Sequence, residues 1–157
     1  MSVQAVKPEI DTVGLLPGAQ FADAYCVAVD GVTHDARHAA EKMLSRGPRW
    51  IDALLALRNH LVKPFGLKTP PPNANASAQS IGIFPVVGET PDRLVAGFND
   101  SHLDFRVVVD VATSGDSQRV TLTTLVLTHN LLGRVYLAII LPFHRLIARA
   151  MLRQVAA

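Results

Sequence analysis

The sequence predicts an α+β domain in which a curved antiparallel β-sheet wraps around a long, kinked C-terminal helix, with two helices after the first strand. Three observations support this prediction. A strand-like run is followed by two helical runs, four further strand-like runs are separated by short turns, and the chain ends in a long amphipathic segment. A sheet with one apolar face must cover that face, and the last segment is the natural cover.

The N-terminal part divides into an irregular lead-in and the start of the domain. Pro8 and Gly14 interrupt residues 1–16, and Pro17-Gly18 follow directly, so an irregular lead-in is expected there. A single domain is expected over residues 17–157, a length that suits one hydrophobic core. Its first strand spans Ala19 to Val29, where alternate side chains share one face, and Asp30-Gly31 ends it.

Two helical runs follow the first strand. The first begins at Thr33 or His34 and reaches Arg46. The second extends from Pro48 to about Val62, because proline suits the first helical position and a wide apolar face follows, including Trp50. The proline-rich stretch at residues 70–78 favours a surface loop.

Four strand-like runs then lead to the C-terminal helix. They cover Gln79 to Val87, Arg93 to Phe98, His102 to Thr113 and Gln118 to Thr128. The breaks between them, at residues 88–91, 99–101 and 114–117, are short and rich in turn formers. The four runs should therefore pair as an antiparallel meander.

The last segment, Thr128 to Val155, reads as one helix that Pro142 bends. Thr128 or Asn130 is expected to cap it, since both side chains carry an oxygen that can accept an early backbone N–H. Apolar side chains at helical spacing predict the face that packs on the sheet: Leu132, Val135, Tyr136, Ile139, Phe143, Leu146, Ile147 and Ala150. The apolar run from Val135 to Phe143 is too short to span a bilayer, and packing on the sheet is favoured over a membrane-surface helix.

Composition narrows the class of protein. The sequence has no secretory signal pattern, so a cytoplasmic location is expected, and Cys26 is the single cysteine. Basic residues are scattered and aromatic residues make up only 6%, which argues against a nucleic-acid binder. His34 and His38 have a spacing that suits zinc, but no further ligand motif accompanies them, so no metal site is expected. A GxGxxG motif is absent, and no cofactor is expected.

Four segments carry a resemblance to a known family. They are RWIDALLALRNHLVKPFGL from Arg49, IGIFPVVGETP from Ile81, HLDFR from His102 and THNLLGRVYLAIILPFHRLI from Thr128. With the order of elements, they resemble domain-of-unknown-function family 2867, a bacterial family of the START-like, polyketide-cyclase-like helix-grip (SRPBCC) superfamily. The resemblance covers about residues 17–153. It implies a hydrophobic cavity between sheet and helix. Because members of the family occur either alone or attached to short-chain-dehydrogenase-like domains, it also suggests a functional link to such a protein.

The preferred hypothesis is a binding module for a hydrophobic or amphipathic small molecule in that cavity. The side chains expected to line the cavity or contact the ligand are Trp50, Phe84, Phe105, Arg134, Tyr136, Ile139 and Phe143. Arg134 is included as an anion contact one turn into the helix. A non-catalytic interaction domain that forms a homodimer is a further hypothesis.

The second hypothesis is a cyclase- or dehydratase-like enzyme that uses the same cavity. Its candidate acid–base groups are His102, Asp104 and Arg106 on one predicted strand face, with His129 at the junction before the long helix. The competing interpretation places the strand residues on a solvated face and gives His129 a hinge role. His144 or Arg145 is expected to satisfy the backbone carbonyl that Pro142 leaves unpaired.

Overall fold

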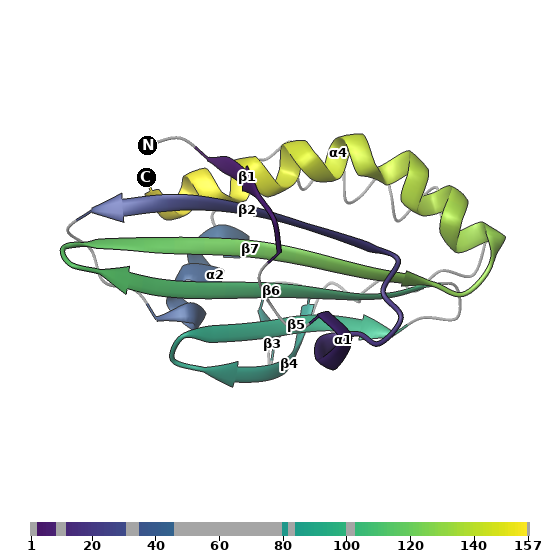
Figure 1. The fold of residues 1–157 in the computed structure, drawn as a ribbon, viewed down its shortest axis with the longest axis horizontal. Coiled ribbons are helices and arrows are strands. Elements are labelled where there is room, and N and C mark those ends of the chain that lie inside the picture. The colour runs from purple at the N-terminus through teal and green to yellow at the C-terminus, as the bar shows by residue number, and fades with distance from the viewer. Residues whose placement is uncertain are drawn as a thin grey trace.

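In the part of the chain that the structure describes, seven antiparallel strands form a curved sheet in the order β1-β2-β7-β6-β5-β4-β3 (Figure 1). The computed structural model describes residues 3–8, 12–30, 35–45, 80–81, 84–99 and 103–156. The strands are Gln4–Val6 (β1), Phe21–Asp30 (β2), Ser80–Ile81 (β3), Phe84–Thr90 (β4), Arg93–Asn99 (β5), Leu103–Ser114 (β6) and Ser117–Thr128 (β7). The helices are Thr12–Leu15 (α1), Ala36–Ser45 (α2) and Leu131–Ala156 (α4).

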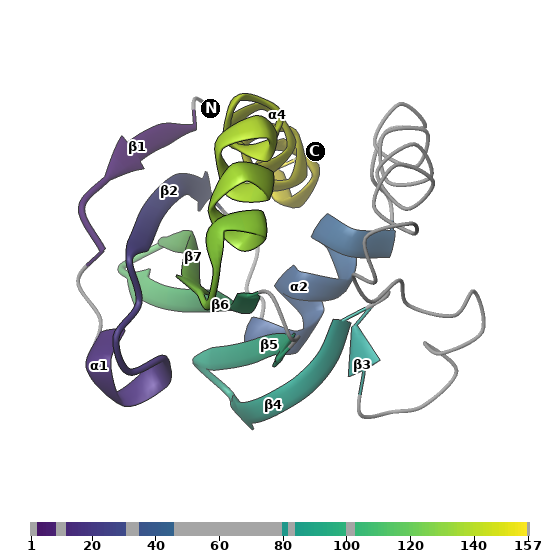
Figure 2. The same ribbon diagram turned by 90° about the vertical axis from the view of Figure 1, so that its right-hand side faces the viewer.

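The sheet is a trough that holds α2 and α4 on its concave side, whereas α1 lies on the convex side (Figure 2). Helix α4 contacts β2, β7 and α2. This arrangement confirms the predicted α+β helix-grip fold, with a curved sheet around a long C-terminal helix. The second helix expected at residues 48–62 and the loop expected at residues 70–78 lie outside the described residues.

The predicted meander is confirmed, with two corrections at its start. The run expected over residues 79–87 is two strands, β3 and β4, and β4 continues through the residues expected to form a turn. The β4–β5 turn lies at Pro91-Asp92 instead, where Thr90 Oγ1 accepts the Arg93 backbone N–H at 3.1 Å. A register irregularity between Val86 and Gly88 allows the glycine to remain within the strand.

The expected irregular lead-in is wrong for two short segments. Strand β1 adds to the edge of the sheet, where Gln4 pairs with Cys26 of β2, and α1 follows it. Pro8 and Pro17 come just after the ends of these two elements, so the prolines are compatible with regular structure before them. Leu16, directly after α1, is 3% exposed and therefore belongs to the packed part of the domain.

Side-chain oxygens cap both long helices. Asp35 Oδ1 accepts the His38 backbone N–H at 2.7 Å, so α2 begins at Ala36, and the expected start at Thr33 or His34 is wrong. Asn130 Oδ1 accepts the Gly133 N–H at 2.9 Å, which confirms Asn130 as the cap of α4. Pro142 lies inside a continuous helix that is visibly bent in Figure 1, as expected.

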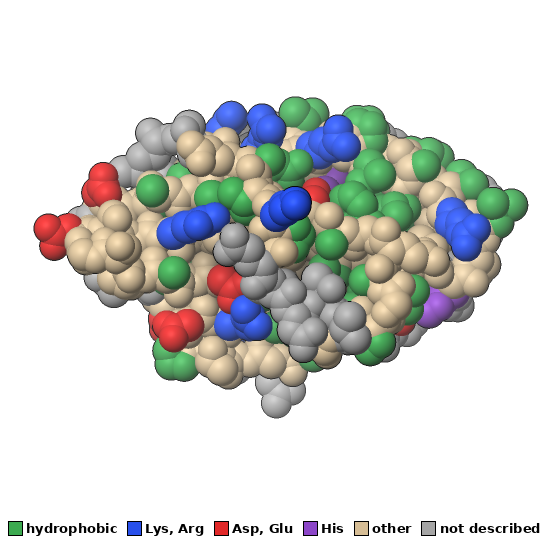
Figure 3. Space-filling model, in the orientation of Figure 1, with side chains coloured by type: hydrophobic (Ala, Val, Ile, Leu, Met, Phe, Trp, Pro, Cys, Tyr) green, Lys and Arg blue, Asp and Glu red, His purple; other side chains and the backbone are tan. Residues whose placement is uncertain are grey.

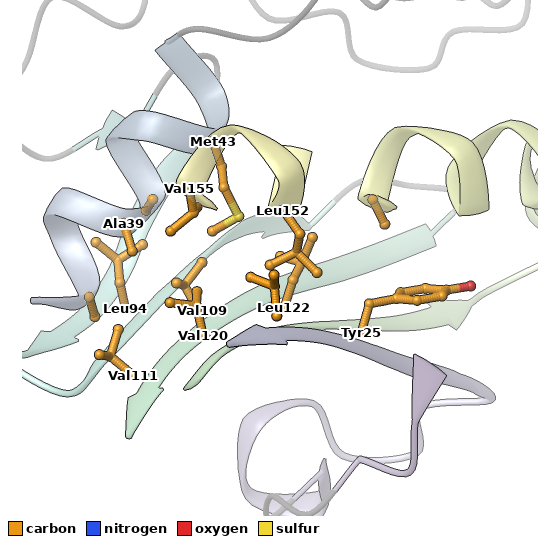
Figure 4. Close-up of a cluster of buried hydrophobic side chains, with 14 of the residues drawn as sticks. Tyr25, Ala39, Met43, Leu94, Val109, Val111, Val120, Leu122, Leu152 and Val155 are labelled. Carbon is orange, nitrogen blue, oxygen red and sulfur yellow. The ribbon is translucent and has the colours of Figure 1, made fainter. Parts of the chain in front are cut away.

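The hydrophobic core lies where α2 and the C-terminal half of α4 meet the sheet. In Figure 4, Met43 of α2 and Leu152 and Val155 of α4 approach the strand residues Val109 and Leu122. Met43, Leu152 and Val155 are no more than 1% exposed. Burial of such side chains contributes roughly 1.5–3 kcal/mol each, so this end of α4 is firmly held.

The side of α4 that faces the sheet differs from the predicted one. Ala148, Leu152 and Val155 are buried, and none of them belongs to the predicted face. Four residues of the predicted face are exposed instead: Val135 (47%), Ile139 (63%), Phe143 (43%) and Leu146 (59%). Helix α4 is apolar on most of its circumference, so hydrophobic periodicity alone selected the wrong side.

Candidate functional site

Burial changes along the concave face from one end of the strands to the other. Residues paired across β2, β7, β6 and β5 share a face and form rows across the sheet. We call two of them the inner rows: Tyr25, Leu122, Val109 and Leu94, and Val27, Val120 and Val111. Every inner-row side chain is at most 7% exposed, because α2 and the end of α4 cover them.

The next two rows, nearer the start of α4, are less covered. These outer rows are Asp23, Thr124, Val107 and Ala96, and Phe21, Val126 and Phe105; Ala96, at the β5 end, is 2% exposed. Thr124 and Val126 in the middle strand are buried, but the residues of β2 and β6 on either side of them are only half-buried. Apolar and polar side chains therefore remain partly accessible on the helix side of the sheet.

The facing half of α4 is also incompletely buried. Between Arg134 and Ile147 no side chain of α4 is buried, in contrast to the C-terminal half. Leu137, Ile140 and His144 lie at helical spacing from buried Ala148, so they continue the sheet-facing side and are half-buried. We call these three residues together with the outer rows the half-open interface.

A histidine–aspartate pair joins the two sides of this interface. His144 Nε2 lies 3.1 Å from both carboxylate oxygens of Asp23. The two side chains are only 21% and 19% exposed. Because a carboxylate has no hydrogen to donate, the Nε2–H donates to it, and in the neutral imidazole Nδ1 is then the acceptor. Phe21 holds the ring edge-on, with centroids 6.1 Å apart.

The pair was missed by the sequence reasoning, which assigned His144 a role at the helix bend. Its partners are 121 positions apart, so no local motif marks them. A signal existed in the predicted first strand, where Asp23 shares a face with apolar residues such as Tyr25 and Val27. A carboxylate on an apolar face needs a hydrogen-bonding partner from the element that covers it.

The predicted catalytic residues lie on the other face of the sheet. Strand alternation places Asp104 and Arg106 on the convex side, since their neighbour Val107 is in a concave row. His129 Nε2 contacts Asp104 Oδ1 at 2.9 Å, and Arg106 Nη1 donates to the Phe105 carbonyl at 2.8 Å. Two of the four residues therefore meet, but away from α4, and the expectation that this set shares the helix-side interface is wrong. His102 lies outside the described residues.

The predicted ligand-contacting residues are divided among three environments. Phe105 belongs to the outer rows, and Tyr136 is half-buried on α4. Ile139 and Phe143 lie on the exposed side of α4, so the expected inward placement of these two is wrong. Arg134 is exposed one turn into α4, and its expected role as an anion contact stays a prediction. Trp50 and the side chain of Phe84 lie outside the described part of the chain.

The electrostatic character of the half-open interface is set by one carboxylate. Asp23 is its only acidic side chain, and His144 is its hydrogen-bonding partner. The Arg149 guanidinium lies 5.5 Å from the centre of the Tyr25 ring in the neighbouring inner row. Across the described ranges, His, Cys, Asp and Glu side chains do not gather in a group of three or more that could hold a metal ion.

The fold and the half-open interface define an α+β helix-grip domain with one polar pair set among apolar side chains. The chain belongs to the family described as "Protein of unknown function (DUF2867)", whose model matches residues 15–151. A comparison with curated proteins found no match. Among solved structures, a conserved protein from Geobacillus kaustophilus is similar at 8% identity and a TM-score of 0.40, over 87% of this chain and 93% of that one.

Proposed function

We propose that this chain is a START-like helix-grip domain that binds an amphipathic small molecule in the half-open interface. The observation that carries the proposal is the change in burial along the strands. The inner rows are at most 7% exposed, whereas Phe21, Val107 and Phe105 of the outer rows are half-buried beneath a stretch of α4 that has no buried side chain. An apolar ligand seated there would remove these partly accessible surfaces from water.

The Asp23–His144 pair supports a ligand with a polar head. Binding sites for small molecules combine mostly apolar lining with a few polar groups that fix orientation. The Asp23 carboxylate disfavours an anionic head, because like charges repel in a partly desolvated site. The chemistry therefore favours a neutral head that can both donate and accept, such as the hydroxyl group of a long-chain alcohol.

Native mass spectrometry of the freshly purified protein, followed by denaturing extraction, tests whether a small molecule co-purifies. In parallel, the protein is titrated with a long-chain alcohol and with the carboxylic acid of equal chain length while backbone amide NMR shifts are recorded. We expect the alcohol to bind more tightly. We also expect its shift changes to concentrate in the outer rows and to leave the inner rows, around Val109 and Leu122, nearly unchanged.

Matched substitutions make the test specific. Val107→Trp fills the outer rows and should weaken alcohol binding by tenfold or more, a change of about 1.4 kcal/mol. Val87→Trp is the control, since Val87 is 58% exposed on β4. Circular dichroism establishes that both variants are folded. Equal affinity in the two variants, or an extract and titrations that reveal no bound molecule, would refute the proposal.

The same pair favours a second candidate, an acid–base enzyme of the cyclase or dehydratase kind. With Nε2–H held by Asp23, neutral His144 has Nδ1 as an acceptor, which is how a carboxylate orients a general base. The test is whether the protein converts any extracted molecule into a product, which mass spectrometry detects as a change in the mass of that molecule. Conversion that is lost in His144→Leu while ligand binding persists would support catalysis, and a recovered molecule that wild-type protein leaves unchanged would argue against it.

A further inference from the structure

The outward side of α4 carries a continuous row of apolar side chains. The row consists of Leu131, Val135, Ile139, Phe143 and Leu146, spaced at four and three residues, and each is between 43% and 74% exposed. We call it the outer stripe. Figure 3 shows hydrophobic side chains on the surface over the N-terminal half of α4, with basic side chains beside them. A continuous exposed apolar row of this extent usually marks an interaction surface, whereas apolar residues exposed by chance are scattered singly.

The charged side chains on the helix that carries the outer stripe are all basic. Residues 117–157 contain five of the chain's 15 basic residues and none of its 13 acidic residues. Four of these arginines are on α4 and exposed: Arg134, Arg145, Arg149 and Arg153. An apolar helical face flanked only by arginines complements an interface that is both apolar and negatively charged.

By length and composition, Leu131–Val155 is the one segment in the described part of the chain apolar enough to cross a membrane, and 17% of its most apolar stretch of 18 residues is buried. Crossing would extract Leu152 and Val155 from the core and break the Asp23–His144 pair. It would also place Arg145 near the centre of the bilayer, which is strongly unfavourable. The packing therefore favours a helix that lies in the membrane surface with its inner side still on the sheet.

From this combination of apolar exposure and unbalanced positive charge, we propose that the outer stripe and its flanking arginines dock this domain on the surface of an anionic phospholipid bilayer. The apolar side chains enter the boundary between head groups and acyl chains, and the arginines contact lipid phosphates. A second copy of the chain, packed stripe to stripe, is disfavoured because it would bring the arginines of both copies together.

The test is flotation of the full-length protein with vesicles of pure phosphatidylcholine and with vesicles of phosphatidylcholine mixed with phosphatidylglycerol. We expect binding to the mixed vesicles only, and weaker binding as salt is raised. Arg145→Gln should reduce partitioning roughly fivefold. Ile139→Gln should reduce it by a similar factor, because it removes an inserted apolar side chain.

Two control variants lie on other surfaces. Val87→Gln removes an equally exposed apolar side chain of β4, and Arg119→Gln removes an exposed charge of β7. Both should bind vesicles as the wild type does. The proposal is overturned by binding that is equal for the two vesicle types, by control variants that weaken it as much as Ile139→Gln, or by no binding at all. Light scattering that shows a dimer, converted to monomer by Ile139→Gln without vesicle binding, would assign the stripe to a second copy instead.

Discussion

The Asp23–His144 pair should contribute measurably to stability, and a double-mutant cycle isolates that contribution. The cycle compares Asp23→Ala, His144→Ala and the double variant with the wild type. A hydrogen bond to a charged group contributes about 1.5–3 kcal/mol when well buried. Because the side chains are still 21% and 19% exposed, we expect a coupling energy of about 1–2 kcal/mol. His144→Ala should cost more than Asp23→Ala, since it also removes the ring contact with Phe21.

The second histidine–aspartate pair supplies an internal comparison. His129 and Asp104 are similarly close, at 2.9 Å, but the two partners differ in exposure, with His129 39% exposed and Asp104 13% exposed, so solvent reaches the pair from the imidazole side. Pairs that are open to solvent contribute little, so we expect their coupling energy to stay below about 1 kcal/mol. We therefore expect the difference in coupling energy between the two pairs to follow burial and not the distance between the partners.

Urea unfolding followed by circular dichroism provides the free energy of unfolding of each variant, with equal m-values as the condition for comparing them. If the two cycles yield the same coupling energy within error, the reasoning from burial is wrong. A coupling energy near zero for Asp23 and His144 would also mean that the pair does not fix α4 on the sheet, and a ligand role for it would lose its structural support.

Three further predictions concern the fold. Gly97→Ala should cost about 3 kcal/mol or more, since φ is +150° and the added Cβ would lie 2.2 Å from the Phe105 carbonyl oxygen. Gly88→Ala is the matched control. Its added Cβ would have no atom within 4 Å, so stability should change by less than about 0.5 kcal/mol. Leu152→Ala should cost about 2–5 kcal/mol and Leu146→Ala almost nothing, because the first is fully buried and the second is 59% exposed. Asn130→Ala should cost about 1 kcal/mol by loss of the α4 cap. Chemical denaturation measures all three, and equal effects within either matched pair, or an unchanged midpoint for the Asn130 variant, would contradict the corresponding structural reasoning.

The order of elements was predictable because strands, turns and helix caps leave local signals. Alternation located β2, β6 and β7, and the oxygen-bearing side chain of Asn130 located the start of α4. Short elements were missed, since three residues of β1 leave no periodic signal and become regular only by pairing with β2. Tertiary pairing decided that part of the fold.

The rotation of α4 could not be predicted from periodicity, because nearly every side of the helix carries apolar residues. Two features that depend on tertiary structure set it. His144 is directed to the sheet by Asp23, and small residues on the same side, Gly133 and Ala148, are buried where the helix approaches the strands. A half-buried hydrogen-bonding partner can outweigh a difference of one apolar side chain, so we expect the polar pair to favour the observed rotation, which hydrophobicity leaves open.

That rotation places the two proposed binding sites on opposite sides of one helix. Ile140 faces the half-open interface, and Ile139, one residue earlier, belongs to the outer stripe. The two proposals are therefore separable: Val107→Trp should abolish ligand binding and spare vesicle binding, and Ile139→Gln should do the reverse. If both variants lose both activities, ligand entry and membrane docking must depend on one another through α4. The part of α4 between Arg134 and Ile147, which has no buried side chain, is the part able to carry that coupling, because the core holds the C-terminal part.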